Sequence, residues 1–145
     1  MDTTRTLVDA LYAGVFRNYT NLKLIVAHAG GVLPLVAPRL FTLGTLPWVP
    51  NPHDITVAEM KEQLSRLYYD VAISANSAAL SGLLELTDER HIVFGTDYPP
   101  ATERGIEENI AALNVFAEHQ GQQTLRYESI AGNALDLFPG IQQRI

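Results

Sequence analysis

Two titratable side chains stand directly after apolar stretches that are typical of β-strands. Asp97 lies in the Gly-Thr-Asp turn after residues 91–95, and His28 ends the apolar run 22–27 just before two glycines. An imidazole with a pKa near neutrality can move a proton, and imidazole and carboxylate groups both bind divalent metals. Because α/β enzymes carry their chemistry at the carboxyl ends of parallel strands, His28 is a candidate proton donor and Asp97 a candidate metal ligand or general base.

The elements that position these residues alternate along the chain. Hydrophobic spacing predicts strands over 22–27, 67–73 and 91–95 and helices over 2–18, 31–43, 56–65, 76–86 and 103–119, with two short helices at the end. Pro38 is expected to kink or split the helix in which it lies. Alternating strands and helices predict a parallel sheet with right-handed crossovers. Three strands would leave two long apolar edges exposed, so the chain is expected to be part of a larger assembly.

Composition narrows the class of protein. The 145 residues suffice for one domain that buries roughly two-thirds of its unfolded surface. The formal net charge of -6 and the scattered Lys and Arg residues argue against binding to nucleic acid. Cysteine is absent, which excludes disulfides and thiolate metal sites. Apolar stretches fall short of the roughly 18 residues of a membrane span, and no signal-peptide pattern is visible, so we expect a cytoplasmic protein without a membrane partner.

Each candidate residue also has a purely structural interpretation. Asp97 could cap the turn before Pro99, and His28 could cap the following helix. Gly30 and Gly31 before a helix could suggest an anion site, which would make the chain a small binding module, but two adjacent glycines are a weak phosphate signal and no basic cluster supports it.

Four motifs in a fixed order resemble a known family. They are residues 27–31 (Ala-His-Ala-Gly-Gly) with Pro34, 69–72 (Tyr-Asp-Val-Ala), 95–99 (Gly-Thr-Asp-Tyr-Pro) and 132–138 (Gly-Asn-Ala-Leu-Asp-Leu-Phe). The chain resembles the metal-dependent amidohydrolase-related enzymes (amidohydrolase 2), in the branch of aminocarboxymuconate-semialdehyde, resorcylate and methylsalicylate decarboxylases. The resemblance implies an α/β fold that is the C-terminal part of a (β/α)8 TIM-type barrel. The chain would form one partial-barrel domain, 1–145, that runs from the helix after the fifth strand to the C-terminus.

The resemblance also implies roles for three residues. His28 corresponds to the family's acid/base histidine at the end of the sixth strand, and Asp97 to its metal-ligating aspartate at the end of the eighth. Arg39 occupies the position of an arginine that can cross a dimer interface to meet a substrate carboxylate. The metal would be zinc or manganese. The family's His-x-His or Glu-x-His pair on the first strand and its histidine on the fifth have no counterpart in this sequence.

Three functions follow from these observations. The first is a metal-dependent decarboxylase or hydrolase of a small aromatic or unsaturated carboxylic acid, completed by homo-oligomerisation or by a complementary N-terminal half. The second is a non-catalytic half-barrel remnant or interaction module, which the missing ligands favour. The third is the anion-binding module.

Overall fold

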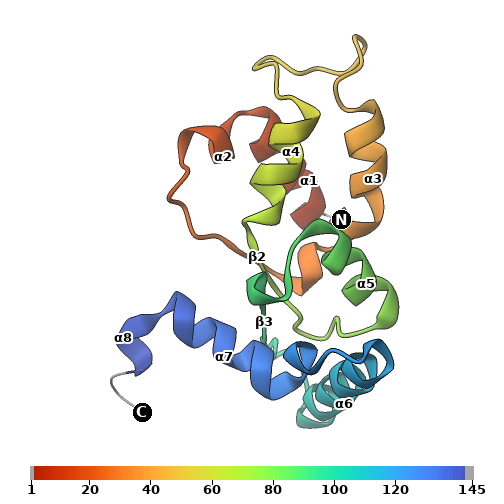
Figure 1. Cartoon of the computed structure of the whole chain (residues 1–145), viewed down its shortest axis with the longest axis vertical. Helices are drawn as coiled ribbons and strands as arrows, with labels where there is room; N and C mark the ends of the chain where they lie inside the picture. Colours follow the sequence, from red (N-terminus) through yellow and green to blue (C-terminus); the bar gives the residue numbers. More distant parts are fainter. Residues whose placement is uncertain (1, 143–145) are drawn as a thin grey trace.

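The structure is a computed structural model that describes residues 2–142, so Met1 and residues 143–145 of the expected 1–145 domain lie outside the described part. Helices and strands alternate through most of the chain (Figure 1). The elements are α1 (Asp2–Tyr12), α2 (Val15–Asn18), β1 (Ile25–Val26), η1 (His28–Gly30), α3 (Leu33–Leu43), α4 (Val57–Ser65), β2 (Tyr68–Asp70), α5 (Ser77–Leu86), η2 (Glu89–His91), β3 (Ile92–Val93), α6 (Glu103–Gln120), η3 (Gln123–Leu125), α7 (Tyr127–Leu137) and α8 (Pro139–Gln142).

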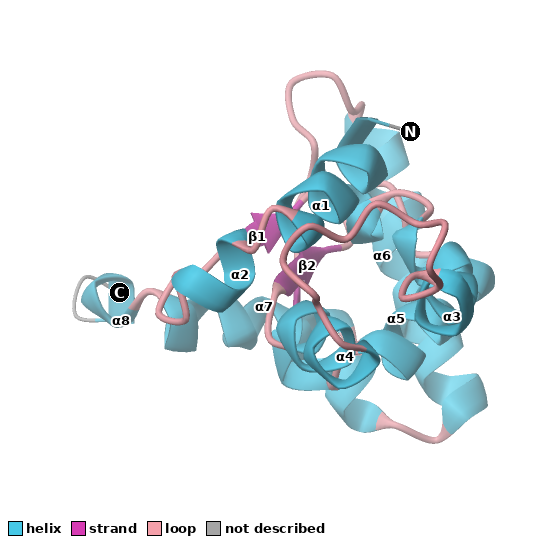
Figure 2. Ribbon diagram, turned by 90° about the horizontal axis from the view of Figure 1, so that it is seen from above, coloured by secondary structure: helices cyan, strands magenta, loops and turns pink. Residues whose placement is uncertain are grey.

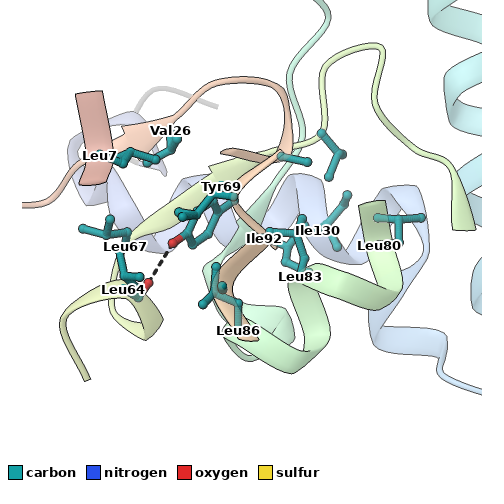
Figure 3. Close-up of a cluster of buried hydrophobic side chains, with 14 of the residues drawn as sticks. Leu7, Val26, Leu64, Leu67, Tyr69, Leu80, Leu83, Leu86, Ile92 and Ile130 are labelled. Atoms are coloured by element: carbon teal, nitrogen blue, oxygen red, sulfur yellow. Dashed lines mark hydrogen bonds between the residues drawn. The ribbon is translucent and has the colours of Figure 1, made fainter. Parts of the chain in front are cut away.

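The strands form one parallel sheet in the order β1-β2-β3, as the alternation predicts. Val26 pairs with Tyr69, and Tyr69 with Ile92. These three side chains therefore lie on the same face of the sheet, where all are buried. Around them pack leucines from α1, α4 and α5 (Figure 3). This layer of side chains fixes the sheet against its helices.

Tyr69 is the largest side chain of this layer and is fully buried. Its hydroxyl donates a hydrogen bond of 2.8 Å to the carbonyl of Leu64 at the end of α4 (Figure 3). Burial raises the pKa of Tyr69 above its ordinary value, so the phenol stays protonated and keeps this donor. One tyrosine thus joins the middle strand to the helix that precedes it.

The strands are shorter than the sequence predicts. β1 ends just before His28, whose φ of 54° lies in the left-handed region, and β2 ends before Ile73, with a φ of 46°. β3 begins late because the turn η2 (Glu89–His91) precedes it. The sequence prediction of these strand ends is wrong, because apolar residues continue into turns where the backbone is no longer extended.

Two helix predictions also need correction. The expected helix over 2–18 divides into α1 and α2 at Gly14, which has a φ of 71° and so cannot continue a right-handed helix. The helix over Leu33–Leu43 is not split at Pro38. The other helices begin close to the predicted residues, and α4 and α5 have Thr56 and Asn76 as N-caps. Helices α3 and α5 contact each other, while α1 lies near β1 (Figure 2).

The two edges of the sheet differ. Val93 accepts a hydrogen bond from the N–H of Val71, so the neighbouring carbonyl of Ile92 faces away from β2. The side-chain amide of Asn133 on α7 donates to that carbonyl at 2.8 Å and to the carbonyl of Glu89 at 2.7 Å. Within residues 2–142, β1 pairs only with β2. The outer side of β1 is therefore the open edge, and α7 covers the start of β3.

Candidate active site

His28 and Asp97 meet at the carboxyl ends of the strands. Nε2 of His28 lies 4.0 Å from Oδ1 of Asp97, and the two side chains are 47% and 37% exposed. The histidine begins η1, just after β1, and the aspartate lies in the turn after β3, so these groups come together from the two outer strands of the sheet. The arrangement leaves an imidazole nitrogen and a carboxylate oxygen accessible to a small molecule.

The other nitrogen of His28 has a defined partner. Nδ1 lies 3.0 Å from the carbonyl oxygen of Ala72, just after β2. A carbonyl oxygen can only accept, so Nδ1 carries the proton of this hydrogen bond. Nε2 is then the nitrogen that gains or loses a proton, and it is the nitrogen that faces Asp97. This geometry suits a proton donor or acceptor.

Sequence reasoning missed Asp70 as a residue of this site. Its Oδ1 accepts a hydrogen bond of 3.0 Å from the backbone N–H of His28 and another of 3.0 Å from the N–H of Ala72. An acid at the carboxyl end of the middle strand was a visible signal. Its role depends on two N–H groups that the sequence does not place together.

The backbone around the site adopts unusual conformations. His28, Ala29, Ile73 and Asp97 all have φ values between 46° and 58°. Left-handed conformations cost free energy for residues other than glycine and cluster at functional sites, where the surrounding structure holds them. Here they turn the chain sharply after β1, β2 and β3.

Arg39 makes no direct bond to this pair. It is an exposed residue of α3 and lines a surface hollow with Tyr12 and Trp48. None of the hydrogen bonds or ion pairs of residues 2–142 joins Arg39 to His28 or Asp97. The role of Arg39 toward a substrate therefore stays a prediction.

The donor set is too small for a complete metal centre. The described part of the chain has no group of three or more His, Cys, Asp or Glu side chains that could hold a metal ion. Catalytic zinc normally has three protein ligands, whereas the pair of His28 and Asp97 offers one imidazole and one carboxylate. His28 and Asp97 could form only part of a metal site. Any further ligands would have to come from outside residues 2–142 of this chain.

No helix within residues 2–142 has the length and apolar character needed to cross a membrane.

Comparisons with known proteins agree with this architecture. The amidohydrolase family model matches residues 1–140, so the chain belongs to the amidohydrolase family. It is 31% identical to 6-methylsalicylic acid decarboxylase of Penicillium expansum over 97% of this chain and 42% of that protein. It is 33% identical to 6-methylsalicylic acid decarboxylase acuB of Aspergillus aculeatus over 98% of this chain and 43% of that protein. The chain thus spans about two-fifths of the length of these relatives.

Solved structures support the same fold. An amidohydrolase II crystal structure matches with a TM-score of 0.75 and 25% identity, over 94% of this chain and 42% of that one. A dihydroxybenzoic acid decarboxylase from Polaromonas with bound manganese matches with a TM-score of 0.66 and 21% identity, over 89% of this chain and 37% of that one. The predicted α/β class and the resemblance to the decarboxylase branch are confirmed: the chain folds like part of an amidohydrolase barrel.

Proposed function

We propose that the chain is the C-terminal part of a metal-dependent decarboxylase that acts on a small aromatic or unsaturated carboxylic acid. The observation that carries the proposal is the approach of His28 Nε2 to Asp97 Oδ1 at the carboxyl ends of parallel strands. The relatives named as decarboxylases of aromatic acids support the reaction type. In this proposal the domain is one partial barrel over 1–145, which begins in the helix after the fifth barrel strand.

His28 acts as the proton donor in this reaction. In the protonated ring, Nδ1–H stays bound to the Ala72 carbonyl while Nε2–H points into the site. The proton passes from Nε2 to the ring carbon that bears the carboxylate. The bond from that carbon to the carboxyl group then breaks, its electron pair restores the aromatic ring, and carbon dioxide leaves. The neutral imidazole is reprotonated from solvent, to which the side chain is 47% exposed.

Asp97 contributes one ligand to a divalent metal, zinc or manganese, in this proposal. Such an ion binds and polarises the oxygens of the substrate. The two-donor set requires additional ligands from a complementary N-terminal half or another chain. Arg39 is exposed on α3, and its proposed contact with a substrate carboxylate would be made across an interface with another copy.

The metal content of the 145-residue chain combined with the N-terminal part of a relative, measured without chelators or a metal-binding tag, tests this function. About one metal per chain, lowered in Asp97→Asn and unchanged in the control Asp136→Asn, is the expected result; Asp136 is an exposed acid on α7. Turnover of 6-methylsalicylic and dihydroxybenzoic acids should be lost in the same variant. An Asp97→Asn protein that kept full metal binding and turnover would exclude the role of Asp97.

A non-catalytic half-barrel is the alternative, and the lack of a three-ligand cluster in residues 2–142 favours it. A folded chain that binds no metal and turns over none of these acids, even when mixed with the N-terminal part of a relative, would support this alternative.

A further inference from the structure

A single carboxylate oxygen joins both partners of the hydrogen bond that orients His28. Nδ1 of His28 is bound to the carbonyl of Ala72 at 3.0 Å. Oδ1 of Asp70 accepts the backbone N–H of His28 at 3.0 Å and the backbone N–H of Ala72 at 3.0 Å. The donor residue and the acceptor residue of the orienting bond are therefore both anchored to the same atom.

The anchored segments are strained. His28 has a φ of 54°, and Ile73, next to Ala72, has a φ of 46°. Such conformations are unfavourable for residues other than glycine and persist only where other contacts hold them. Hydrogen bonds to a charged acceptor are stronger than those between neutral groups. The Asp70 carboxylate is thus a suitable group to hold both turns.

Gly95 lies next to Asp70, where a larger residue would be crowded. A Cβ atom built on Gly95, just after β3, would lie 3.3 Å from Cγ of Asp70 and 3.3 Å from Cβ of Ala72. A side chain at position 95 would therefore press on Asp70, and glycine there leaves the carboxylate in the position where it accepts the two N–H groups.

We propose that Asp70 is a positioning residue: its Oδ1 holds His28 and Ala72 so that Nδ1 of His28 keeps the proton and Nε2 faces the reacting group. The proposal deepens the proposed function, on which its catalytic meaning rests. It requires the position of the acceptor oxygen and not the negative charge as such. Asp70→Asn keeps an oxygen at the same place without the charge, whereas Asp70→Glu keeps the charge but moves it by one methylene.

The tautomer of His28 is the direct readout. Nitrogen NMR of protein labelled with ¹⁵N-histidine, at an alkaline pH where imidazole is neutral, reports which ring nitrogen carries the proton. The loss of one signal pair in His28→Gln assigns the residue among the four histidines. Asp88→Ala is the matched control, because Asp88 also accepts a backbone N–H and contacts the Nδ1 of another histidine, His91.

We expect the Nδ1–H form in the parent protein, in Asp70→Asn and in the Asp88→Ala control. In Asp70→Glu the Nε2–H form should appear. Retention of the parent tautomer in folded Asp70→Glu, or its loss in folded Asp70→Asn, would overturn the proposal. If Asp70→Glu does not fold, Asp70→Ala takes its place: loss of the acceptor oxygen should give the Nε2–H form, and retention of the parent tautomer in folded Asp70→Ala would overturn the proposal.

Activity distinguishes this proposal from the proposed function. In a complete enzyme that decarboxylates an aromatic acid, Asp70→Glu should lower kcat about 10–100-fold with little change in KM, as for other residues that orient a functional histidine. Failure of every variant and the parent to turn over any acid would refute the proposed function, while the tautomer comparison would still decide the role of Asp70.

Discussion

Gly30 offers a quantitative test of the packing beneath His28. It has a φ of 76°, and a Cβ atom added there would lie 3.2 Å from the ring of Tyr69, which is fully buried. Gly30→Ala therefore combines two costs. A left-handed conformation costs about 1–2 kcal/mol for alanine, and forcing extra volume into a packed core costs about 1–3 kcal/mol. The expected loss in the free energy of unfolding is about 2–5 kcal/mol.

Gly121 provides the control, because it shares the backbone conformation without the contact. It caps α6 with a φ of 64°, and an added Cβ would meet no atom within 4 Å. Gly121→Ala should cost only the backbone part, about 1–2 kcal/mol. Urea denaturation followed by circular dichroism gives the free energy of unfolding of both variants. The comparison holds if the slope of that free energy against urea concentration is the same as in the parent protein. Equal losses in the two variants would show that Tyr69 does not confine Gly30 and would refute the reasoning.

Three further predictions concern stability. Thr56→Ala should lower the free energy of unfolding by about 1 kcal/mol in thermal or urea melts, since Thr56 caps α4 through the N–H of Glu59. Hydrogen bonds from the backbone and side chain of Thr56 lower the pKa of Glu59 in the folded state. The contribution of Glu59 to stability is therefore present above its ordinary pKa and is lost as the pH falls through the lowered pKa. Glu59→Gln should flatten this dependence of the free energy of unfolding on acid pH, and an unchanged pH profile would contradict the prediction. Asn109→Ala should cost about 2 kcal/mol or more, because the buried amide accepts from Ala75 and donates to Val71, and a hydrogen-exchange experiment should show faster exchange at Ala75.

The sequence predicts that His28 and Asp97 lie close together, but it does not predict the turns and hydrogen bonds that hold them there. His28 and Asp97 each follow an apolar run, and the carboxyl ends of parallel strands all lie at the same end of the sheet. The distance of 4.0 Å depends on how far the turns rotate, and both residues adopt left-handed conformations that hydrophobic periodicity does not reveal. The role of Asp70 is not visible in the sequence, because its partners are the backbone N–H groups of His28 and Ala72 and almost every residue has such a group.

Helix prediction was limited by the same kind of local conformation. Gly14 divides the first helix because the chain adopts the left-handed region there, which a glycine permits but does not require. Pro38 removes one helical donor, yet the helix continues to Leu43. Around it, α3 packs tightly on α5, where a Cβ on Gly82 would lie 2.9 Å from Pro34. The contact lies one turn before Pro38, in the same helix.

Arg39 shows a different limit. Sequence places it in a helix, eleven residues after His28, and the structure confirms the helix and shows the side chain exposed. Neither observation says what faces it from another molecule. The proposed contact with a substrate carboxylate therefore stays a prediction that depends on an interface.

The two edge strands of the sheet differ in how easily another strand could pair with them. Asn133 of α7 occupies the carbonyl of Ile92 at the start of β3, whereas β1 has only β2 as a partner strand within residues 2–142. Head-to-tail addition of copies, each β1 joining the β3 of the next, would have to displace that amide at every junction. A two-fold pair through β1 alone would leave the amide in place and would close on itself, which is the geometry of a finite complex and not of a fibre.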